Sequence, residues 1–185
     1  MINILVTGSN GQLGSEINAL TQIYSDYNFH FTDSKELDIT NHEAVHQFIK
    51  TNKISVIINC AAHTAVDKAE TETDLSTKLN HLAVENFGNI AKENNIKLIH
   101  ISTDYVFDGT NYIPYSEKQK TNPQSVYGNT KLAGEQALQK INPENSIIIR
   151  TSWVYSSFGN NFVKTMLRLA NERKELGVIV DQIGT

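Results

Sequence analysis

A tyrosine and a lysine four residues apart form the first pair in this sequence that could act together as acid and base. Tyr127 and Lys131 stand in the run Tyr-Gly-Asn-Thr-Lys, which opens a helical pattern. Residues i and i+4 of a helix share a face, so the phenol and the ammonium can point into one pocket. A free tyrosine has a pKa of about 10, and a lysine cation in a partly dry site is expected to lower that pKa toward the working pH. This spacing alone is common on solvated helix faces, so the neighbouring motifs must decide whether the pair is catalytic.

A hydroxyl at a strand end supplies part of that context. Thr103 follows Ser102 at the end of an apolar run, and ligands of parallel α/β sheets bind at the carboxyl ends of the strands. The Thr103 hydroxyl can therefore hold a carbonyl oxygen while Tyr127 donates a proton. The alternative role for Thr103 is a cap at the end of the strand.

A glycine-rich turn near the start of the chain supplies the rest. Gly8, Gly11 and Gly14 lie between a β-branched run and a helical pattern. Gly8 permits a tight turn, Gly11 lets the backbone approach a pyrophosphate, and Gly14 lets helix and strand pack closely. The helix N-terminus then directs N–H groups and partial positive charge at the phosphates. The spacing G-x-x-G-x-x-G is one residue longer than the usual dinucleotide fingerprint, and a turn without a ligand is the alternative.

An acidic residue follows the second apolar run, about 20 positions after the glycine turn. Asp33 can accept a hydrogen bond from a ribose 2′-hydroxyl and would repel a 2′-phosphate, while Lys35 can soften that repulsion. Asp33 can also be an ordinary turn or capping residue. The cofactor is therefore expected to be NADPH or NADH, with the choice open.

Short β-branched runs alternate with longer amphipathic segments along the chain. Several short runs are apolar at successive positions, such as 56–58 and 147–149, which is typical of strands covered on both faces. The alternation predicts an α/β fold, a doubly wound parallel sheet of the Rossmann-like type. We expect a polar surface loop near the site at 108–125, strands at 2–7, 28–32, 55–60, 97–102, 146–150 and 177–180, and helices around 13–20, 44–49, 79–91, 127–141 and 162–169.

Composition excludes several classes of function. The 185 residues are 39% hydrophobic and 19% charged with a formal charge of −4, and the basic residues form no stripe that would bind nucleic acid. No apolar run reaches the roughly 20 residues of a membrane span, and the N-terminus has no basic leader. Cys60 is the sole cysteine; it is expected to be a small strand-end residue rather than a nucleophile, and the cytoplasm is the expected compartment.

Longer motifs resemble the extended short-chain dehydrogenase/reductase superfamily and, within it, the dTDP-4-dehydrorhamnose reductase family. The resemblance spans essentially the whole chain. It is carried by Val-Thr-Gly-Ser-Asn-Gly-Gln-Leu-Gly at 6–14, Leu-Asp-Ile-Thr at 37–40, Asn-Cys-Ala-Ala-His-Thr-Ala-Val-Asp-Lys-Ala-Glu at 59–70, Ser-Thr-Asp-Tyr-Val-Phe-Asp-Gly at 102–109, Tyr-Gly-x-x-Lys at 127–131 and Arg-Thr-Ser-Trp-Val-Tyr at 150–155.

The resemblance implies a role for each matching residue. Thr103, Tyr127 and Lys131 would be catalytic, with Lys131 also binding the nicotinamide ribose. Thr103, Asp104 and Trp153 would contact the nucleotide-sugar, although Trp153 can also be structural. The cofactor would be held by Gly8, Asn10, Gly11, Gln12, Leu13, Gly14, Asp33, Asp38, Ile39, Ala62, His63, Thr64, Tyr127 and Lys131. No residue is assigned to a metal; the resemblance also implies that Mg²⁺ can take part and that two copies can form a homodimer.

The implied reaction is hydride transfer from NAD(P)H to the 4-keto group of a dTDP-4-dehydro-L-rhamnose, with Tyr127 giving the proton. Related nucleotide-sugar dehydratases typically carry a glutamate where this chain has Tyr105, which argues against elimination. An epimerase or dehydratase remains one alternative. A non-catalytic regulatory subunit, of the kind that partners methionine adenosyltransferase, is another, and the presence of Thr103, Tyr127 and Lys131 argues against it.

One part of the resemblance stops early. In the family a stretch like Asp-Gln-x-Gly at 181–184 leads into a C-terminal lobe that closes over the sugar nucleotide. We therefore expect residues 1–185 to form the cofactor-binding domain, with 151–185 as the start of an incomplete substrate-binding region and the substrate lobe truncated. Because binding sites are often built between lobes, such a chain is expected to bind cofactor and to turn over weakly or not at all.

Overall fold

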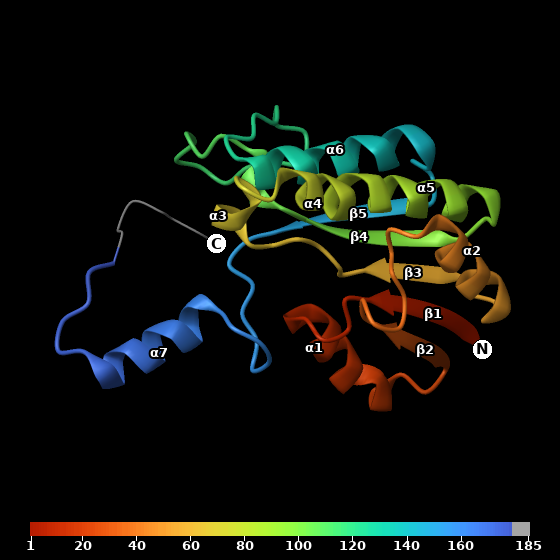
Figure 1. Cartoon of the computed structure of the whole chain (residues 1–185), viewed down its shortest axis with the longest axis horizontal. Helices are drawn as coiled ribbons and strands as arrows, with labels where there is room; N and C mark the ends of the chain where they lie inside the picture. Colours follow the sequence, from red (N-terminus) through yellow and green to blue (C-terminus); the bar gives the residue numbers. More distant parts are fainter. Residues whose placement is uncertain (179–185) are drawn as a thin grey trace.

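Five parallel strands form the centre of the molecule, in the order β2-β1-β3-β4-β5 (Figure 1). The structure is a computed structural model and describes residues 1–178. The strands are β1 (Ile2–Thr7), β2 (Tyr27–Thr32), β3 (Val56–Asn59), β4 (Lys97–Thr103) and β5 (Ser146–Thr151). Each lies within two residues of a strand expected from the β-branched runs, because those runs are short, apolar and bounded by polar turns.

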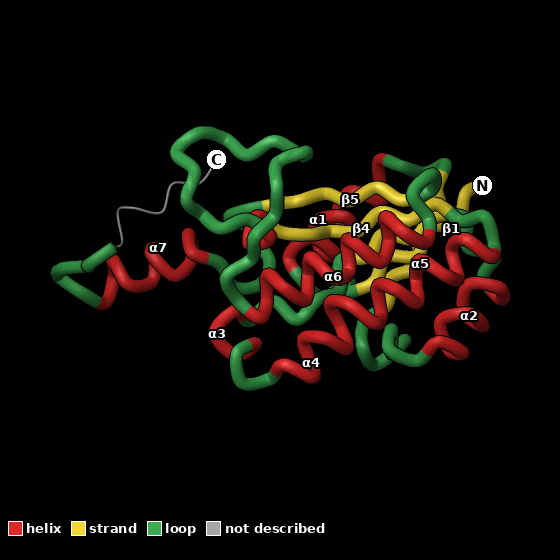
Figure 2. Tube along the Cα trace, turned by 90° about the horizontal axis from the view of Figure 1, so that it is seen from above, coloured by secondary structure: helices red, strands yellow, loops and turns green. Residues whose placement is uncertain are grey.

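The helices lie on both faces of this sheet (Figures 1 and 2). One face carries α2 (His42–Thr51), α5 (Ala83–Glu93) and α6 (Val126–Ile141), and the opposite face carries α1 (Gln12–Leu20). The remaining turns are η1 (Thr21–Ile23), α3 (Val66–Ala69), α4 (Thr73–Thr77), a π-helical turn η2 (Lys78–Leu82) and η3 (Asp104–Val106), followed by α7 (Phe162–Glu172). The predicted doubly wound, Rossmann-like arrangement is confirmed.

The hydrophobic core lies between the sheet and the layer of α2, α5 and α6. Leu5 of β1 and Ile57 of β3 are fully buried against Phe87 and Ile90 of α5 and Leu138 of α6. The buried apolar residues of α5 run from Ala83 to Ala91 at intervals of three and four, so this helix turns one apolar stripe to the sheet. This rigid layer fixes the positions of the strand ends, where the predicted site lies.

The second face of the sheet is covered less completely by the described residues. At β1 the expected burial on both faces holds, but Ile147 and Ile149 of β5 are 59% and 42% exposed. The reason is geometric: α1 lies below β1 and β2, while α7 stands away from the sheet (Figure 1). The segment before α7 is tied to α1 by a hydrogen bond from Asn161 Nδ2 to Gln12 Oε1 of 2.9 Å.

Three other segments differ from the expected structure or add detail to it. The long helix expected around 79–91 is divided into η2 and α5, and α4 precedes them directly in the chain. The polar segment 108–125 contains no helix or strand, as predicted, and it packs by stacking Tyr115 on Phe107 with 4.2 Å between ring centroids. Of the strand expected at 177–180, Gly177 and Val178 have no regular structure and the other two positions lie outside the described residues, as does the stretch 181–185.

Candidate active site

The glycine turn after β1 depends on the absence of side chains at two positions. Gly8 has a φ of +66°, and a Cβ atom there would lie 2.8 Å from the Cα of Ala61. A Cβ on Gly14 would overlap the carbonyl oxygen of Gly8 and lie 2.7 Å from the Cα of Ser9. The turn therefore brings the backbone of β1, α1 and the segment after β3 into direct contact, as the sequence predicts for Gly8 and Gly14.

The N-terminus of α1 begins at the end of this turn. Gly11 is the N-cap residue and makes no side-chain cap bond, and the first turn holds no acidic side chain. The first N–H groups of a helix have no partner within the helix, and the helix dipole places partial positive charge there. This is an environment that favours the phosphate groups of a nucleotide.

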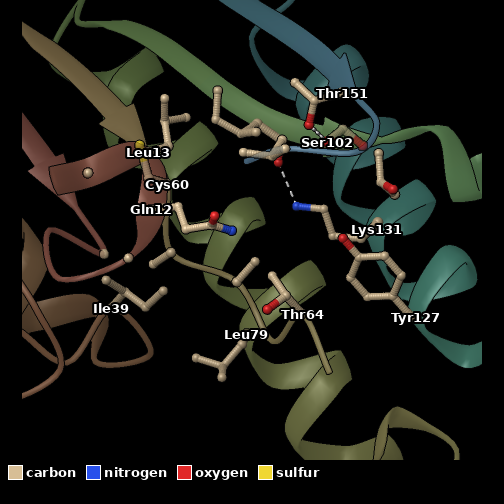
Figure 3. Close-up of a pocket in the computed structure, with 18 of the residues that line it drawn as sticks. Gln12, Leu13, Ile39, Cys60, Thr64, Leu79, Ser102, Tyr127, Lys131 and Thr151 are labelled. Carbon is tan, nitrogen blue, oxygen red and sulfur yellow. Dashed lines mark hydrogen bonds between the residues drawn. The ribbon is translucent and has the colours of Figure 1, made fainter. Parts of the chain in front are cut away.

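A cavity of about 660 Å³ joins the glycine turn to the predicted acid–base pair (Figure 3). Gln12 and Leu13 of α1 lie on one side of the cavity, and Tyr127 and Lys131 of α6 lie on the other. The cavity opens at the carboxyl ends of the strands, since Thr32, Thr103 and Thr151 all contribute to its lining. Its volume falls within the range of small-molecule and cofactor sites.

Most of the residues predicted for the site line this cavity. For the cofactor these are Gly8, Gly11, Gln12, Leu13, Gly14, Asp33, Asp38, Ile39, Ala62, Thr64, Tyr127 and Lys131. For the substrate they are Thr103, Asp104 and Trp153. Sequence reasoning did not find several others, among them Cys60, Leu79, Ile101, Ser102, Tyr105, Ser152 and Val154. Most of these residues follow the carboxyl end of a strand, and that position in the sequence could have identified them. No residue of the loop 108–125 is part of the lining.

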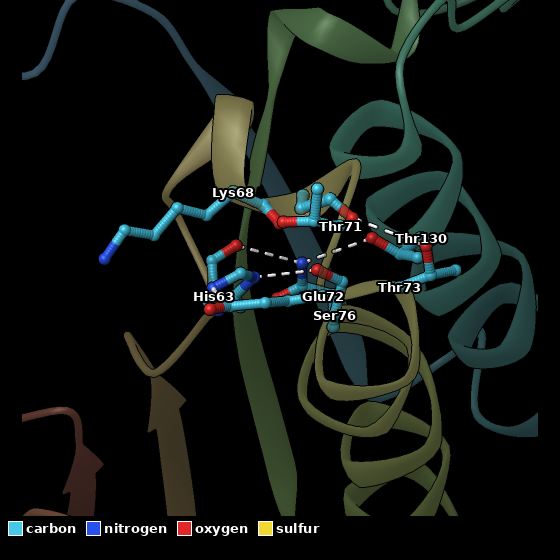
Figure 4. A network of polar contacts seen from close by, with 9 residues as sticks. His63, Lys68, Thr71, Glu72, Thr73, Ser76 and Thr130 are labelled. Carbon is cyan, nitrogen blue, oxygen red and sulfur yellow. Dashed lines mark hydrogen bonds and ion pairs between the residues drawn. The ribbon is translucent and has the colours of Figure 1, made fainter.

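Two predicted cofactor residues are not among those that line the cavity. Asn10 is exposed on the glycine turn. The ring of His63 points away from the cavity to α4, where Nδ1 lies 2.7 Å from Ser76 Oγ and Nε2 lies 3.0 Å from the Glu72 carboxylate (Figure 4). His63 therefore holds the segment after β3 in place, while its neighbours Ala62 and Thr64 reach the cavity.

A buried asparagine on η2 reinforces this segment. Asn80 Oδ1 accepts from the His63 backbone N–H at 2.8 Å, and Asn80 Nδ2 donates to the His63 carbonyl at 3.1 Å. The same Nδ2 donates to Thr130 Oγ1 of α6 at 3.2 Å. Asn80 thus links the wall of the cavity to the helix that carries Tyr127. The sequence offered one signal, a polar residue inside an otherwise apolar helical stripe.

The start of α6 positions Tyr127 and Lys131. Ser125 caps the helix by accepting from the Gly128 N–H at 3.1 Å. A Cβ on Gly128 would overlap the carbonyl oxygen of Tyr105, so glycine allows the helix to approach the end of β4. Tyr127 and Lys131 are both buried, and Lys131 Nζ donates to the Ile101 carbonyl at 2.6 Å. The pair lies in the cavity and not on a solvated helix face.

The pKa of Tyr127 departs from expectation. The sequence led us to expect that Lys131 lowers it, but burial raises the pKa of the Tyr127 phenol, and a hydrogen bond to Thr103 opposes that rise. Desolvation of the phenolate therefore outweighs the hydrogen bond from Thr103, and the expected lowering by Lys131 is not found. Burial also lowers the pKa of Lys131 to about 8, against the opposing charge of Glu135. A raised pKa keeps Tyr127 protonated, which is the form that donates.

The end of β4 presents a hydroxyl and a carboxylate to Tyr127. Thr103 Oγ1 donates to Asp104 Oδ1 at 3.1 Å and accepts from the Tyr105 N–H at 3.2 Å. Thr103 therefore caps η3, which is the alternative role that the sequence left open for it. It also contacts Tyr127. The Tyr105 ring packs edge-on against that of Tyr127, with 5.6 Å between centroids.

Two further residues complete the description of the cavity. Trp153 has a φ of +51°, an uncommon conformation for a large residue, and packs edge-on against Phe162 at 5.2 Å. Cys60 follows the end of β3, as predicted, and burial raises its pKa to about 12. The thiol therefore stays protonated at neutral pH, and the expectation that it is not a nucleophile agrees with this chemistry.

Within residues 1–178, no helix has both the length and the apolar character needed to cross a membrane. The same residues contain no group of three or more histidine, cysteine, aspartate or glutamate side chains placed to hold a metal ion. The Mg²⁺ implied by the resemblance therefore finds no support in the described part of the chain.

The parallel sheet with its glycine turn defines the class of this protein as a Rossmann-like α/β protein. The chain belongs to the family described as the RmlD substrate binding domain, whose model matches residues 2–185. It is 48% identical over 185 residues to the dTDP-4-dehydrorhamnose reductase of Salmonella typhimurium. The matched region covers 99% of this chain and 62% of that protein.

Solved structures give the same family. The chain superimposes with a TM-score of 0.94 on a dTDP-4-dehydrorhamnose reductase from Clostridium acetobutylicum, at 47% identity over 100% of this chain and 65% of that one. A dTDP-4-dehydrorhamnose reductase from Bacillus anthracis, solved in complex with NADP, gives a TM-score of 0.90 at 41% identity over 95% of this chain and 62% of that one. The chain thus spans about 62% of the length of curated relatives in this family, among them the Salmonella typhimurium reductase.

Proposed function

We propose that this chain provides the cofactor-binding and proton-donating part of an NAD(P)H-dependent reductase that converts dTDP-4-dehydro-L-rhamnose to dTDP-L-rhamnose. The observation that carries the proposal is the single cavity lined both by the glycine turn and by Thr103, Tyr127 and Lys131. The family membership and the NADP bound by the Bacillus anthracis relative support the same reaction.

The residues present fit a dinucleotide. The close backbone contacts at Gly8 and Gly14 leave a concave surface that no side chain fills, at the N-terminus of a helix that favours phosphate. Asp33 and Asp38 line the part of the cavity beyond β2, where the adenosine end would be held, and Ala62, Thr64 and Lys131 line the part toward the nicotinamide. When bound, NAD(P)H supplies the hydride.

The proton for the product hydroxyl comes from Tyr127. Its pKa is raised by burial, so the phenol is protonated at neutral pH and can donate to the alkoxide that forms at sugar C4. The Thr103 hydroxyl, at the same strand end, orients the carbonyl oxygen toward the phenol. Lys131 adds a positive charge that favours the phenolate left after donation.

The substrate side of the cavity is assigned to Asp104 and Trp153. We further propose that residues 151–185 begin the substrate-binding region, because Ser152, Trp153 and Val154 line the cavity immediately after β5. Tyr105 places a phenol beside Tyr127 where an elimination reaction would use a carboxylate. Reduction is therefore favoured over dehydration or epimerisation.

The test separates cofactor binding from turnover. Titration of the chain with NADPH and NADH should give saturable binding, and a protein that carries this chain at the relatives' full length should consume reduced nicotinamide only when the 4-keto sugar nucleotide is added. Tyr127→Phe should lower the turnover number by about 10²- to 10⁴-fold and leave cofactor affinity within about twofold.

Tyr115→Phe is the matched control, since its hydroxyl bonds Asp108 outside the cavity and its loss should leave turnover unchanged. Retention of most activity in Tyr127→Phe would refute the proposed proton donor. Cofactor binding without any turnover of the full-length protein would instead favour a non-catalytic subunit with this fold.

A further inference from the structure

A buried line of polar side chains runs from the glycine turn to Lys131. The Thr7 hydroxyl donates to Asn59 Oδ1 at 2.7 Å, Asn59 Nδ2 lies 3.1 Å from His100 Nδ1, and His100 Nε2 lies 3.3 Å from Lys131 Nζ. All four residues are at most 1% exposed. Thr7, Asn59 and His100 are also direct partners in the register of β1, β3 and β4, so the line crosses three strands in order.

The orientation of the Asn59 amide is fixed by its neighbours. Its Oδ1 accepts from the Ala61 backbone N–H at 3.2 Å as well as from Thr7. The Ala61 N–H can only donate, so an amide turned the other way would set two donors against each other. The Asn59 NH₂ group therefore faces His100 Nδ1, and Nδ1 must be the unprotonated acceptor of that ring.

The ring of His100 then carries its proton on the other nitrogen. Burial and the nearby Lys131 lower the pKa of His100 well below its ordinary value, so the ring is neutral and holds a single proton. With Nδ1 accepting, that proton sits on Nε2 and points toward Lys131 Nζ. An ammonium has only N–H groups to offer in return, whereas a neutral amine has a lone pair that accepts this N–H.

We propose that Asn59 and His100 are positioning residues that hold the His100 proton on Nε2 and thereby favour the neutral amine of Lys131 over its ammonium. The lysine consequently releases a proton more readily. Its use in catalysis rests on the proposed function: when Tyr127 has given its proton away, an N–H bond of the Lys131 ammonium breaks and an O–H bond forms on the phenolate. The amine that remains accepts the N–H of His100.

Other charged groups around Lys131 act in known directions. Glu135, one turn further along α6, favours the ammonium, but its carboxylate is engaged by Arg150 of β5 at 2.6 Å and by the Ser102 hydroxyl at 2.5 Å. Asp104 acts on Tyr127 from η3. Burial of Lys131 lowers its pKa in the same direction as the His100 N–H. Of these groups, His100 contacts Lys131 Nζ directly, so the position of the His100 proton should have the strongest effect on the pKa of Lys131.

The tautomer can be measured on the chain itself, without cofactor or turnover. In ¹⁵N-histidine spectra, His100 should show an unprotonated Nδ1 and a protonated Nε2 across the neutral range. The pKa of Lys131, followed with ¹³C-labelled lysine, should lie near the value of about 8 set by burial. A His100 signal with the proton on Nδ1 would overturn the proposal, whatever any variant does.

A variant pair tests the coupling. In His100→Asn the new amide oxygen can still accept from Asn59, but the N–H that faced Lys131 is lost. The pKa of Lys131 should therefore rise by about one pH unit, which is a tenfold increase in its proton affinity. His81→Asn removes a partly exposed histidine that pairs with Glu85, and it should leave the Lys131 pKa unchanged. An unchanged or lower Lys131 pKa in folded His100→Asn would overturn the proposal.

Turnover gives an independent readout. Because Lys131 must be protonated to restore Tyr127, activity of the full-length protein should fall as pH rises through the lysine pKa, and His100→Asn should move this alkaline limb upward by about one pH unit. A purely structural role for His100 would lower activity at every pH without moving the limb, and that result would count against the proposal. If no turnover is found at all, the proposed function fails while the tautomer measurement still decides this inference.

Discussion

Asp33 is the carboxylate that we propose contacts the adenosine ribose of the cofactor. It follows β2 directly, lines the cavity, and accepts the Ser34 N–H at 2.6 Å through Oδ1. Asp33→Asn keeps that bond and removes the charge, so binding of NADPH relative to NADH should improve by about tenfold because a like-charge contact is lost. Titration with both cofactors measures the ratio.

Asp108→Asn is the control for this change, since Asp108 accepts the Thr110 N–H in the same way but lies outside the cavity. It should alter neither affinity. An unchanged cofactor ratio in Asp33→Asn would show that the carboxylate does not face the ribose.

The burial of Lys131 has a consequence for stability. The unfolded lysine keeps its proton up to pH 10.5 and the folded one loses it near pH 8, so between these values the unfolded state binds more protons. The free energy of unfolding from this group therefore rises with pH across that window, by about 3 kcal/mol in total, and the destabilising effect is fully present below pH 8.

Chemical denaturation of the chain and of Lys131→Met at several pH values isolates this effect. The advantage of the methionine variant should be largest at neutral pH and should shrink as pH rises. Cys60 and Tyr127 have raised pKa values and act in the opposite sense at alkaline pH, but they are common to both proteins and cancel in the comparison. A difference that does not vary with pH would contradict the depressed pKa.

Most of the candidate site could be predicted at the level of single residues, because its residue types follow strand ends or a glycine turn whose physics is local. The direction of a side chain in an irregular segment could not. His63 stands between two residues that line the cavity, yet its ring turns to Ser76 and Glu72. The pKa of Tyr127 also escaped prediction, because it depends on burial that no short motif encodes.

At the scale of elements, the junction of β1 and α1 depends on glycine for two separate reasons. Gly8 and Gly109 both have positive φ, +66° and +72°, but a Cβ would touch Ala61 at Gly8 and nothing within 4 Å at Gly109. Gly109→Ala should cost about 1 kcal/mol of stability from conformational strain alone. Gly8→Ala should cost several kcal/mol and weaken cofactor binding, because the turn must also move away from Ala61.

Thermal or denaturant unfolding measures both variants, and cofactor titration of Gly109→Ala should be normal. Equal losses in the two variants would mean that backbone conformation, and not close packing, is what Gly8 provides.

The strands were predictable because short β-branched runs bounded by polar residues leave few alternatives. The division of the third helix was not. The apolar stripe from Leu79 to Ala91 keeps a helical period, and a π-helical turn changes its phase by only one residue. The turn coincides with Asn80, whose carbonyl oxygen would overlap a Cβ on Gly134 of α6, so a tertiary contact with a residue far along the chain accompanies it.

For the whole molecule, the two faces of the sheet should respond differently to substitution. Leu98 of β4 is 1% exposed in the core, whereas Ile147 of β5 is 59% exposed on the opposite face. Leu98→Ala should lower the free energy of unfolding by about 2–5 kcal/mol because it leaves a cavity. Ile147→Ala should lower it by less than about 1 kcal/mol. Denaturant titration of this chain provides the comparison, and a large loss in Ile147→Ala would show that the second face is covered in solution.

The strand order β2-β1-β3-β4-β5 bears on how the molecule is assembled. β2 pairs with one side of β1, and β3 pairs with the other side; β4 then pairs with β3, and β5 with β4. Every strand after β2 is therefore added at the same edge of the sheet. Synthesis delivers the strands in this same order, while a domain generally folds as a unit. The segments that form the glycine-turn end of the cavity have therefore all been made after about the first third of the chain, well before the helix that carries Tyr127 has been synthesised.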